Sequence, residues 1–388
     1  MTEPIRRVRV YEVALPLRTP FTISGGSLAV RRSLIVELED ASGACGYGES
    51  APFELPFYSD ETLSSAFACL RDVLIPRVLG RRVEDSTAMW TLLGDGVQGN
   101  RMARAGLDTA WWDLAARQRQ VSLADLVTER LTALGVSEAG ARRAEMFSCG
   151  VAIGIPEHLS RASLEGEVRD AVRRGYCRVK LKVRPGWDHE PVRAAQAVLQ
   201  AEGAALPLWV DANGAYDLRR DREALAALDD MGLLFIEQPF PETALGDAVR
   251  YDTTGRTPVC LDESLVSDDV ARQVLEIGGP MIWNLKVQRM GGLEEACRVY
   301  ATGAAAGVKL WVGTMPETGV GAQSAMALAV QGACVYPSDV EPSERWYEPG
   351  TDLLELTMSD AGLMAVPTGP PPAPPLERMT LVLELTNG

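Results

Sequence analysis

The chain has 388 residues, of which 46% are hydrophobic and 23% are charged, a composition typical of a globular protein with room for two domains. The net charge of −15 argues against nucleic acid or an acidic membrane as a partner, whereas a small anion could still be received by a local cation or metal. Seven widely spaced cysteines and only two histidines disfavour a disulfide framework, a zinc site and a Ser-His-Asp triad.

The first part of the chain predicts an α+β domain over residues 1–140. Stretches such as RRVRVYEVAL, RSLIVELED and GACGYGES alternate apolar and polar residues, which indicates strands. From about residue 60 apolar residues recur every three or four positions, which indicates helices. Two loops rich in Gly and Pro, residues 19–27 and 50–60, suit a lid. We see no signal peptide and no apolar run of membrane-spanning length, so we expect a cytoplasmic protein.

Residues 145–340 alternate short apolar strands with helices. The strands are EMFSCGVAI, CRVKLKV, LPLWVDA, LLFIEQP, TPVCLDES, MIWNLKV, VKLWVGT and GACVYPS. Eight strands in this alternation predict a parallel barrel. An open doubly wound sheet would need a Gly-rich phosphate loop after its first strand, and GVAIGI is not one. Within residues 345–388, the run RMTLVLELTNG predicts a last strand that returns to the N-terminal domain.

A charged residue closes each of five consecutive predicted strands. These residues are Lys182, Asp211, Glu237, Asp262 and Lys286, with separations of 29, 26, 25 and 24 residues. Considered singly, each is most simply interpreted as a charged residue at the end of a strand that faces solvent. In a barrel, the five would converge on the rim where barrel enzymes build their sites. Three carboxylates meeting there need a cation, and an all-oxygen set suits Mg²⁺ or Mn²⁺.

The stretch CRVKLKVRPGW places two lysines on one strand. Residues i and i+2 of a strand point the same way, so Lys180 and Lys182 share a face. An exposed edge strand would also carry lysines in water. In a barrel, Lys182 would act as a base helped by Lys180, and Lys286 would meet the substrate from the opposite side. Such a site predicts removal of the proton α to a carboxylate through an enediolate, followed by reprotonation or by loss of a β-leaving group.

The motifs KLK, VDANGAY, IEQP, LDES, NLKVQRMGG and GTMPETGVG resemble the muconate lactonising subgroup of the enolase superfamily. Within it the chain is most similar to the o-succinylbenzoate synthase and N-succinylamino acid racemase family, and the motifs GYGES and GNRMARAGLDTAWWDLAARQ extend the likeness over most of the chain. The resemblance implies an α/β fold, a (β/α)₇β TIM-like barrel with an α+β capping domain formed by the N-terminal region and the C-terminal tail.

The resemblance also implies roles for particular residues. Asp211, Glu237 and Asp262 would ligate Mg²⁺, with Mn²⁺ as the alternative, and Lys182 and Lys286 would be the acid/base pair with Lys180 in support. Near the ligands, Asn213 and Glu263 would orient carboxylates or lysines, although ordinary turn chemistry explains them equally well. The candidate substrate contacts are Arg289, Gly313, Thr314, Met315 and Glu317. Arg289 would receive either a succinyl carboxylate or a neighbouring acid, although an ordinary solvated arginine at a helix start explains it equally well.

The resulting functional hypothesis is o-succinylbenzoate synthesis, in menaquinone biosynthesis, or racemisation of N-acylamino acids, or both. A dipeptide epimerase or muconate cycloisomerase would use the same catalytic set. A barrel that binds a metal and a carboxylate without turnover is the non-enzyme alternative. Thr314, Ala322 and Ser324 depart from residues common in the family, which leaves the substrate open. The oligomeric state is also open, with a homo-oligomer among the options.

Overall fold

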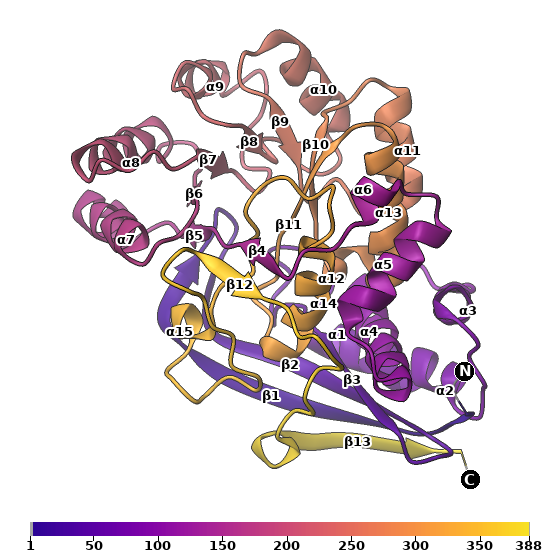
Figure 1. Ribbon diagram of the computed structural model, residues 1–388. Coiled ribbons are helices and arrows are strands. Elements are labelled where there is room, and N and C mark those ends of the chain that lie inside the picture. The colour runs from indigo at the N-terminus through magenta and orange to yellow at the C-terminus, as the bar shows by residue number, and fades with distance from the viewer. Residues whose placement is uncertain (1–2, 388) are drawn as a thin grey trace.

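A curled seven-stranded parallel sheet forms the centre of the protein, seen in a computed structural model that describes residues 3–387 (Figure 1). Its strands follow one another in space as they do in the chain. They are β5 (Val151–Ile153), β6 (Val179–Lys182), β7 (Leu208–Asp211), β8 (Ile236–Glu237), β9 (Val259–Leu261), β10 (Ile282–Leu285) and β11 (Lys309–Val312). The crossover helices are α7 (Arg161–Arg173), α8 (His189–Ala201), α9 (Arg222–Asp229), α10 (Leu245–Thr254), α11 (Asp268–Glu276) and α13 (Leu293–Ala305). Short helix α12 (Val287–Met290) precedes α13, and α14 (Gly319–Ala329) follows β11.

The segment after α14 closes this sheet into a ring of eight. Cys334 forms a parallel bridge with Leu310 of β11, and Ser338 forms one with Cys149, just before β5. These isolated bridges stand where the sequence predicts the eighth strand. In a ring of eight, β6 and β10 lie four positions apart and therefore face each other.

The remaining elements form the capping unit and its connections. An antiparallel sheet has the order β13-β1-β2-β3. Its strands are β1 (Ile5–Thr22), β2 (Ser27–Asp40), β3 (Cys45–Ser50) and β13 (Thr380–Thr386). The helices are α1 (Leu63–Cys69), π-helix η1 (Leu70–Leu74), α2 (Ile75–Val78), α3 (Ser86–Gly94), α4 (Arg101–Arg119), α5 (Leu123–Ala133) and α6 (Glu138–Ala141). The short antiparallel pair β4 (Met146–Ser148) and β12 (Leu363–Ala365), helix α15 (Ser343–Trp346) and the 3₁₀ turn η3 (Leu376–Arg378) lie in the connections between the two units. A second 3₁₀ turn, η2 (Glu157–Leu159), lies between β5 and α7.

Two glycines of the GYGES stretch let α4 lie directly on β3. A Cβ at Gly46 would overlap the backbone of Ala110, and a Cβ at Gly48 would overlap the carbonyl of Gly106. Both contacted residues belong to α4, whose buried residues line much of its length. The glycines therefore bring the helix close to the sheet and fix the end of β3, which leads to the second loop.

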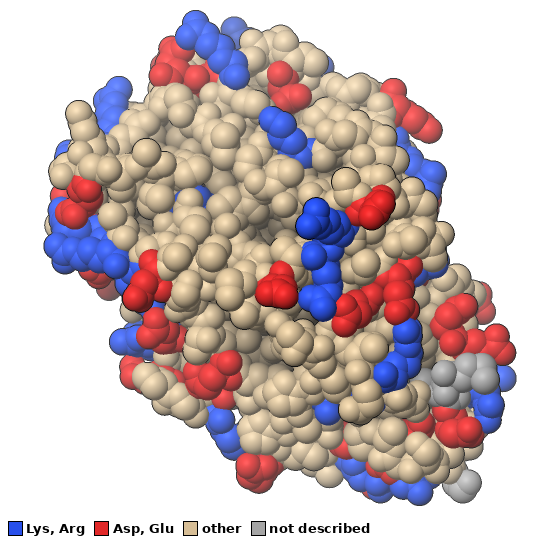
Figure 2. All heavy atoms as spheres, viewed as in Figure 1, with Lys and Arg blue, Asp and Glu red and all other residues tan. Residues whose placement is uncertain are grey.

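The predicted fold class is confirmed, with a parallel barrel of short strands and an antiparallel capping sheet completed by the C-terminal tail. No helix within residues 3–387 has the length and apolar character needed to cross a membrane. On the face shown in Figure 2, acidic and basic side chains are interspersed, and neutral side chains cover much of the surface. The net charge of −15 is thus not gathered into one acidic patch on this face.

Candidate active site

Three carboxylates meet where neighbouring barrel strands end. Asp211 closes β7, Glu237 closes β8 and Asp262 follows β9, and all three are completely buried. Ligand oxygens of the three lie within 4.8 Å of one another. Burial, and then the negative charge of Asp211, raise the pKa of Glu237 to about 8. No described residue donates a hydrogen bond to Glu237 Oε2. A buried oxygen set in which one acceptor receives no hydrogen bond fits a hard divalent cation.

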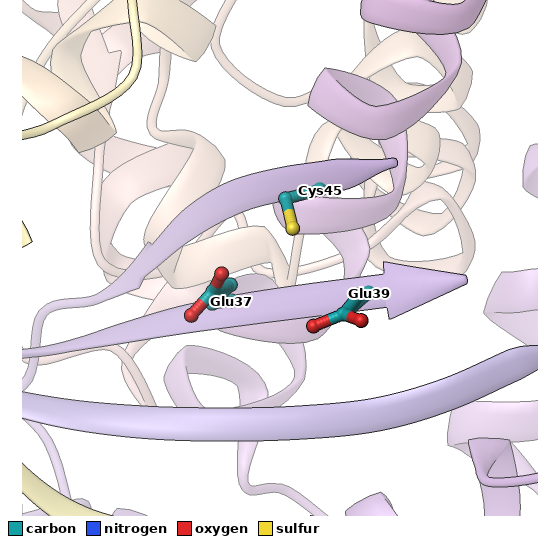
Figure 3. Close-up of side chains that lie close together, drawn as sticks. All are labelled: Glu37, Glu39 and Cys45. Carbon is teal, nitrogen blue, oxygen red and sulfur yellow. The ribbon is translucent and has the colours of Figure 1, made fainter. Parts of the chain in front are cut away.

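A second acidic cluster, on the capping sheet, has a different character. Glu37 and Glu39 of β2 lie beside Cys45 of β3 (Figure 3). Arg9 Nη1 lies 3.0 Å from Glu37 Oε2, and the Tyr11 hydroxyl donates to the same oxygen at 2.8 Å. Glu39 contacts three arginines, Arg6, Arg7 and Arg9. Among the described residues, neither Glu37 nor Glu39 has a buried oxygen that lacks a hydrogen bond, in contrast to Glu237.

The predicted lysines reach the carboxylates from opposite sides of the ring. Lys182, on β6, places Nζ 2.5 Å from Asp211 Oδ2. Lys286 follows β10, and its Nζ lies 2.8 Å from Asp262 Oδ2. Both lysines are buried and line the same cavity. The two ammonium groups therefore flank the carboxylate cluster, with access to a molecule held between them.

Lys180 lies deeper in the barrel and is surrounded by acids. Its Nζ contacts Asp339 and lies 3.5 Å from Asp211 Oδ2 and 3.4 Å from Glu237 Oε2. Burial lowers the pKa of Lys180, but the charges of these three carboxylates outweigh it and raise the pKa overall. Burial lowers the pKa of Lys286 as well, but Asp262, Tyr58 and Glu263 together outweigh burial and raise the pKa overall. In this metal-free geometry Lys180 and Lys286 are held as cations.

Asn213 and Glu263 form a bridge between a lysine and the far side of the cluster. Lys182 Nζ donates to Asn213 Oδ1 at 3.0 Å, and Asn213 Nδ2 donates to Glu263 Oε1 at 2.8 Å. The backbone N–H of Asn213 also donates to Asp211 Oδ1 at 3.0 Å. Asn213 has a φ of 46°, a left-handed conformation that asparagine tolerates better than most residues. These bonds orient Lys182 as well as Asp211.

Arg289 lies against the neighbouring acid. Its Nη1 contacts Asp262, its Nη2 donates to the carbonyl of Asn284 at 2.5 Å and its Nε to the carbonyl of Leu265 at 3.0 Å. The guanidinium thus supports the Asp262 carboxylate on the side away from Lys286. The neighbouring acid that was expected as a partner of Arg289 is therefore in contact with it.

A cavity opens over the lysines. Its walls include Thr314 and Met315, from the loop after β11. The two predicted lid loops contribute Phe21, Ile23, Phe53 and Tyr58, and Trp346 adds a further aromatic ring. Phe53 stacks on Phe57 at a ring-centroid distance of 4.8 Å. The cavity therefore has a charged floor and an apolar roof.

Glu317 and Gly313, the other two predicted substrate contacts from this loop, lie behind the residues that line the cavity. Glu317 Oε2 accepts the N–H of Met315 at 2.9 Å, and burial, followed by the charge of Glu49, raises the pKa of Glu317 to about 7. A Cβ at Gly313 would overlap the side chain of Asn284. Asn284 Nδ2 donates to Glu237 Oε1 at 2.7 Å, so this glycine leaves room for a bond that orients a member of the carboxylate cluster.

The structure adds cavity residues that the sequence interpretation missed. Asp339, after the ring-closing segment, contacts Arg178 and Lys180, and these cations hold its pKa well below the usual range despite burial. Tyr58 accepts a hydrogen bond from Lys286 Nζ at 3.0 Å. Glu341 also lines the cavity. Asp339 stands 53 residues after Lys286, about two of the unit lengths seen between the earlier strand ends, so continuing that spacing would have found it.

Comparison with known proteins follows the same division into two units. Residues 5–128 match the family described as mandelate racemase / muconate lactonizing enzyme, N-terminal domain, and residues 163–370 match enolase C-terminal domain-like proteins. The o-succinylbenzoate synthase of Bacillus subtilis is 35% identical over 353 residues, covering 89% of this chain and 87% of its own. The N-succinylamino acid racemase of an Amycolatopsis species is 38% identical over 364 residues, covering 94% and 92%.

Solved structures show the same architecture. An enolase-superfamily protein from Enterococcus faecalis superposes with a TM-score of 0.82 at 33% identity, covering 98% of this chain and 96% of its own. The muconate lactonizing enzyme of Pseudomonas fluorescens superposes with a TM-score of 0.86 at 22% identity, covering 97% and 98%. The second likeness concerns the fold alone.

Proposed function

This chain belongs to the enolase superfamily, and from that membership we propose that it removes the proton α to a carboxylate, as an N-acylamino acid racemase, an o-succinylbenzoate synthase or both. The observation that carries the proposal is the pair of buried lysines, Lys182 and Lys286, on opposite members of the ring and in one cavity. Two bases on opposite sides of a planar carbon centre can exchange its proton on either face.

We further propose Asp211, Glu237 and Asp262 as ligands of Mg²⁺. Two observations support this ligand set: Glu237 Oε2 receives no hydrogen bond from the described residues, and the three buried carboxylates are crowded together. When bound, Mg²⁺ supplies positive charge to the substrate carboxylate as its α-proton leaves. Asn213, Asn284 and Arg289 hold the ligand carboxylates in their orientations, through the bonds described above.

The chain's own residues account for both proposed outcomes. In racemisation, Lys182 or Lys286 takes the α-proton as a free amine, and the lysine on the other side returns a proton as an ammonium. In dehydration, one lysine takes the α-proton and then, as an ammonium, gives a proton to the β-hydroxyl, which leaves as water, while the other lysine stays an ammonium throughout. The aromatic roof from the two lid loops, including Phe53 and Tyr58, excludes water from the reacting carbon.

One observation favours a second candidate, epimerisation of dipeptides. Glu341 lies at the cavity wall, where its Oε1 accepts the N–H of Ala152 at 2.8 Å. Its Oε2 is buried and receives no hydrogen bond from the described chain, with Arg345 Nε 3.3 Å away. A substrate ammonium would supply the missing donor, whereas a second carboxylate placed there would be repelled.

The test is proton NMR in D₂O with Mg²⁺, following the α-proton of N-succinylamino acids, with Lys182→Ala and Lys286→Ala in parallel. We expect exchange by the wild type and its loss in at least one variant. A protein that exchanges only dipeptide α-protons would establish the second candidate. A protein that dehydrates the cyclohexadiene precursor of o-succinylbenzoate, but exchanges no α-proton of N-succinylamino acids, would be a synthase alone. Mg²⁺ binding with no turnover of any of these substrates would contradict the proposed function and leave a binding barrel.

A further inference from the structure

The amide of Gln288 pairs with the backbone of the capping sheet. Gln288 lies in α12 and is 1% exposed. Its Nε2 donates to the carbonyl of Glu49 at 2.7 Å, and its Oε1 accepts the N–H of Ala51 at 3.0 Å. One side chain of the barrel thus satisfies a donor and an acceptor at the end of β3, as a neighbouring strand would.

The Glu49 side chain fixes the same point from a second direction. Glu49 is completely buried, and its carboxylate accepts the N–H of Thr318 at 3.1 Å, the hydroxyl of Thr318 at 2.6 Å and the N–H of Gly321 at 3.0 Å. These donors belong to the N-terminal end of α14. Residues 49–51 are therefore attached both to α12 and to α14, and the second lid loop leaves from a fixed position.

The second lid loop also contacts Lys286, which lies close to Gln288 at the start of α12. Lys286 is the residue before α12, two positions from Gln288. Tyr58, on the loop, accepts its hydrogen bond from Lys286 at 3.0 Å, and Phe53 lines the same cavity. The loop's anchor and its contact with the reacting ammonium are thus both set by one short stretch of the barrel. Lys182 lies on the other side of the ring and its described bonds run to Asp211 and Asn213 instead.

We propose that Gln288 is a positioning residue that holds the 50–60 loop in place against Lys286. The loop in turn orients the Lys286 ammonium group for proton transfer on that side of the substrate. This inference rests on the proposed function. Removing the amide leaves a buried N–H and a buried carbonyl without partners, and the loop relieves this by moving its backbone toward water. Lys286 then loses the orientation given by Tyr58, while the bonds around Lys182 are untouched.

Gln331 provides a matched control. It is also 1% exposed and also joins the two units, since its Nε2 donates to the carbonyl of Ala124 at 3.2 Å and its Oε1 accepts the hydroxyl of Thr128 at 3.1 Å. Ala124 and Thr128 belong to α5, and Gln331 follows α14 at the end opposite the cavity. A substitution there removes two side-chain amide bonds between the units, one to a backbone carbonyl and one to a hydroxyl, without touching the 50–60 loop.

The experiment compares Gln288→Leu with Gln331→Leu in the Mg²⁺-loaded protein. Exchange of the α-proton is measured in D₂O for each enantiomer of an N-succinylamino acid, and Lys286→Ala identifies the enantiomer that uses Lys286. We expect Gln288→Leu to slow exchange about tenfold or more for that enantiomer and to leave the other within about twofold. We expect Gln331→Leu to change both enantiomers equally. An equal change for both in Gln288→Leu overturns the proposal. Gln288→Met, a closer match in shape, serves if the leucine variant does not fold.

Amide hydrogen exchange of residues 51–60 separates this inference from the proposed function. We expect faster exchange there in Gln288→Leu than in the wild type, and none of this increase in Gln331→Leu. If the wild type turns over none of the substrates named above, the proposed function fails, and faster amide exchange in Gln288→Leu still supports the loop anchor. Unchanged amide exchange in Gln288→Leu overturns the anchor whatever the substrate.

Discussion

Replacing Glu237 by glutamine should stabilise the metal-free protein at alkaline pH. Glu237 is completely buried, and burial together with Asp211 raises its pKa to about 8 from an ordinary value of about 4.3. A carboxyl with a raised pKa stays protonated in the native state after the unfolded chain has released its proton. Stability from this group is therefore complete below pH 4 and falls steadily as the pH rises toward 8.

The size of the effect follows from that difference. At about 1.4 kcal/mol for each pKa unit, the loss above pH 8 is about 5 kcal/mol. Glutamine has no charge to bury, and its side-chain oxygen can still accept the Asn284 amide, which lies 2.7 Å from Glu237 Oε1. The variant should match the wild type near pH 4 and exceed it by about 5 kcal/mol above pH 8, with EDTA present throughout.

The assay is urea denaturation between pH 4 and pH 9, in EDTA and in Mg²⁺. At a hundred times its dissociation constant, Mg²⁺ should stabilise the wild type by about 2.7 kcal/mol and Glu237→Gln by less. Glu37→Gln is the matched control, because Arg9 and Tyr11 already satisfy that carboxylate, and it should keep the wild-type response to Mg²⁺. A wild type indifferent to Mg²⁺, together with no gain in Glu237→Gln at high pH, would refute the reasoning.

Two further predictions concern packing and charge. Asp339→Asn leaves two buried cations, Arg178 and Lys180, without their shared anion, so the free energy of unfolding in urea should fall by about 3–5 kcal/mol. An unchanged free energy of unfolding would show that the other acids around Lys180 are enough to satisfy it. Gly48→Ala should cost about 1–3 kcal/mol in thermal unfolding, since its Cβ meets the α4 backbone. Gly166→Ala, inside α7 with open space around it, should instead add about 1 kcal/mol, and equal effects of the two would contradict the packing argument.

The barrel and most of its charged floor could be predicted from the sequence because their signals are local. Each short strand carries its own apolar run, and the charged residue that ends it follows directly, as in LLFIEQP. Parallel strands align those ends at one rim, so the periodic order of Lys182, Asp211, Glu237, Asp262 and Lys286 already implies their proximity. The two-residue repeat of a strand likewise placed Lys180 and Lys182 on one side.

The contacts that complete the site depend on long-range packing and leave no local pattern. Tyr58 is 228 residues from Lys286, in a loop whose composition fits any exposed turn. Gln288 looks like an ordinary polar residue at a helix start, and only the docking of β3 gives its amide partners. Asp339 follows isolated bridges instead of a regular strand, so only the spacing of the earlier strand ends pointed to it.

The pairing of β13 with β1 has a consequence for synthesis of the protein. Arg7 is opposite Thr386, so the capping sheet gains its fourth strand only after the ribosome has translated the whole barrel. During elongation the outer edge of β1 is open, and its unpaired backbone groups can join another strand. A nascent chain therefore carries an unprotected sheet edge for most of its translation. We expect truncation before Thr380 to increase aggregation more than it alters the barrel, because the open edge would then persist.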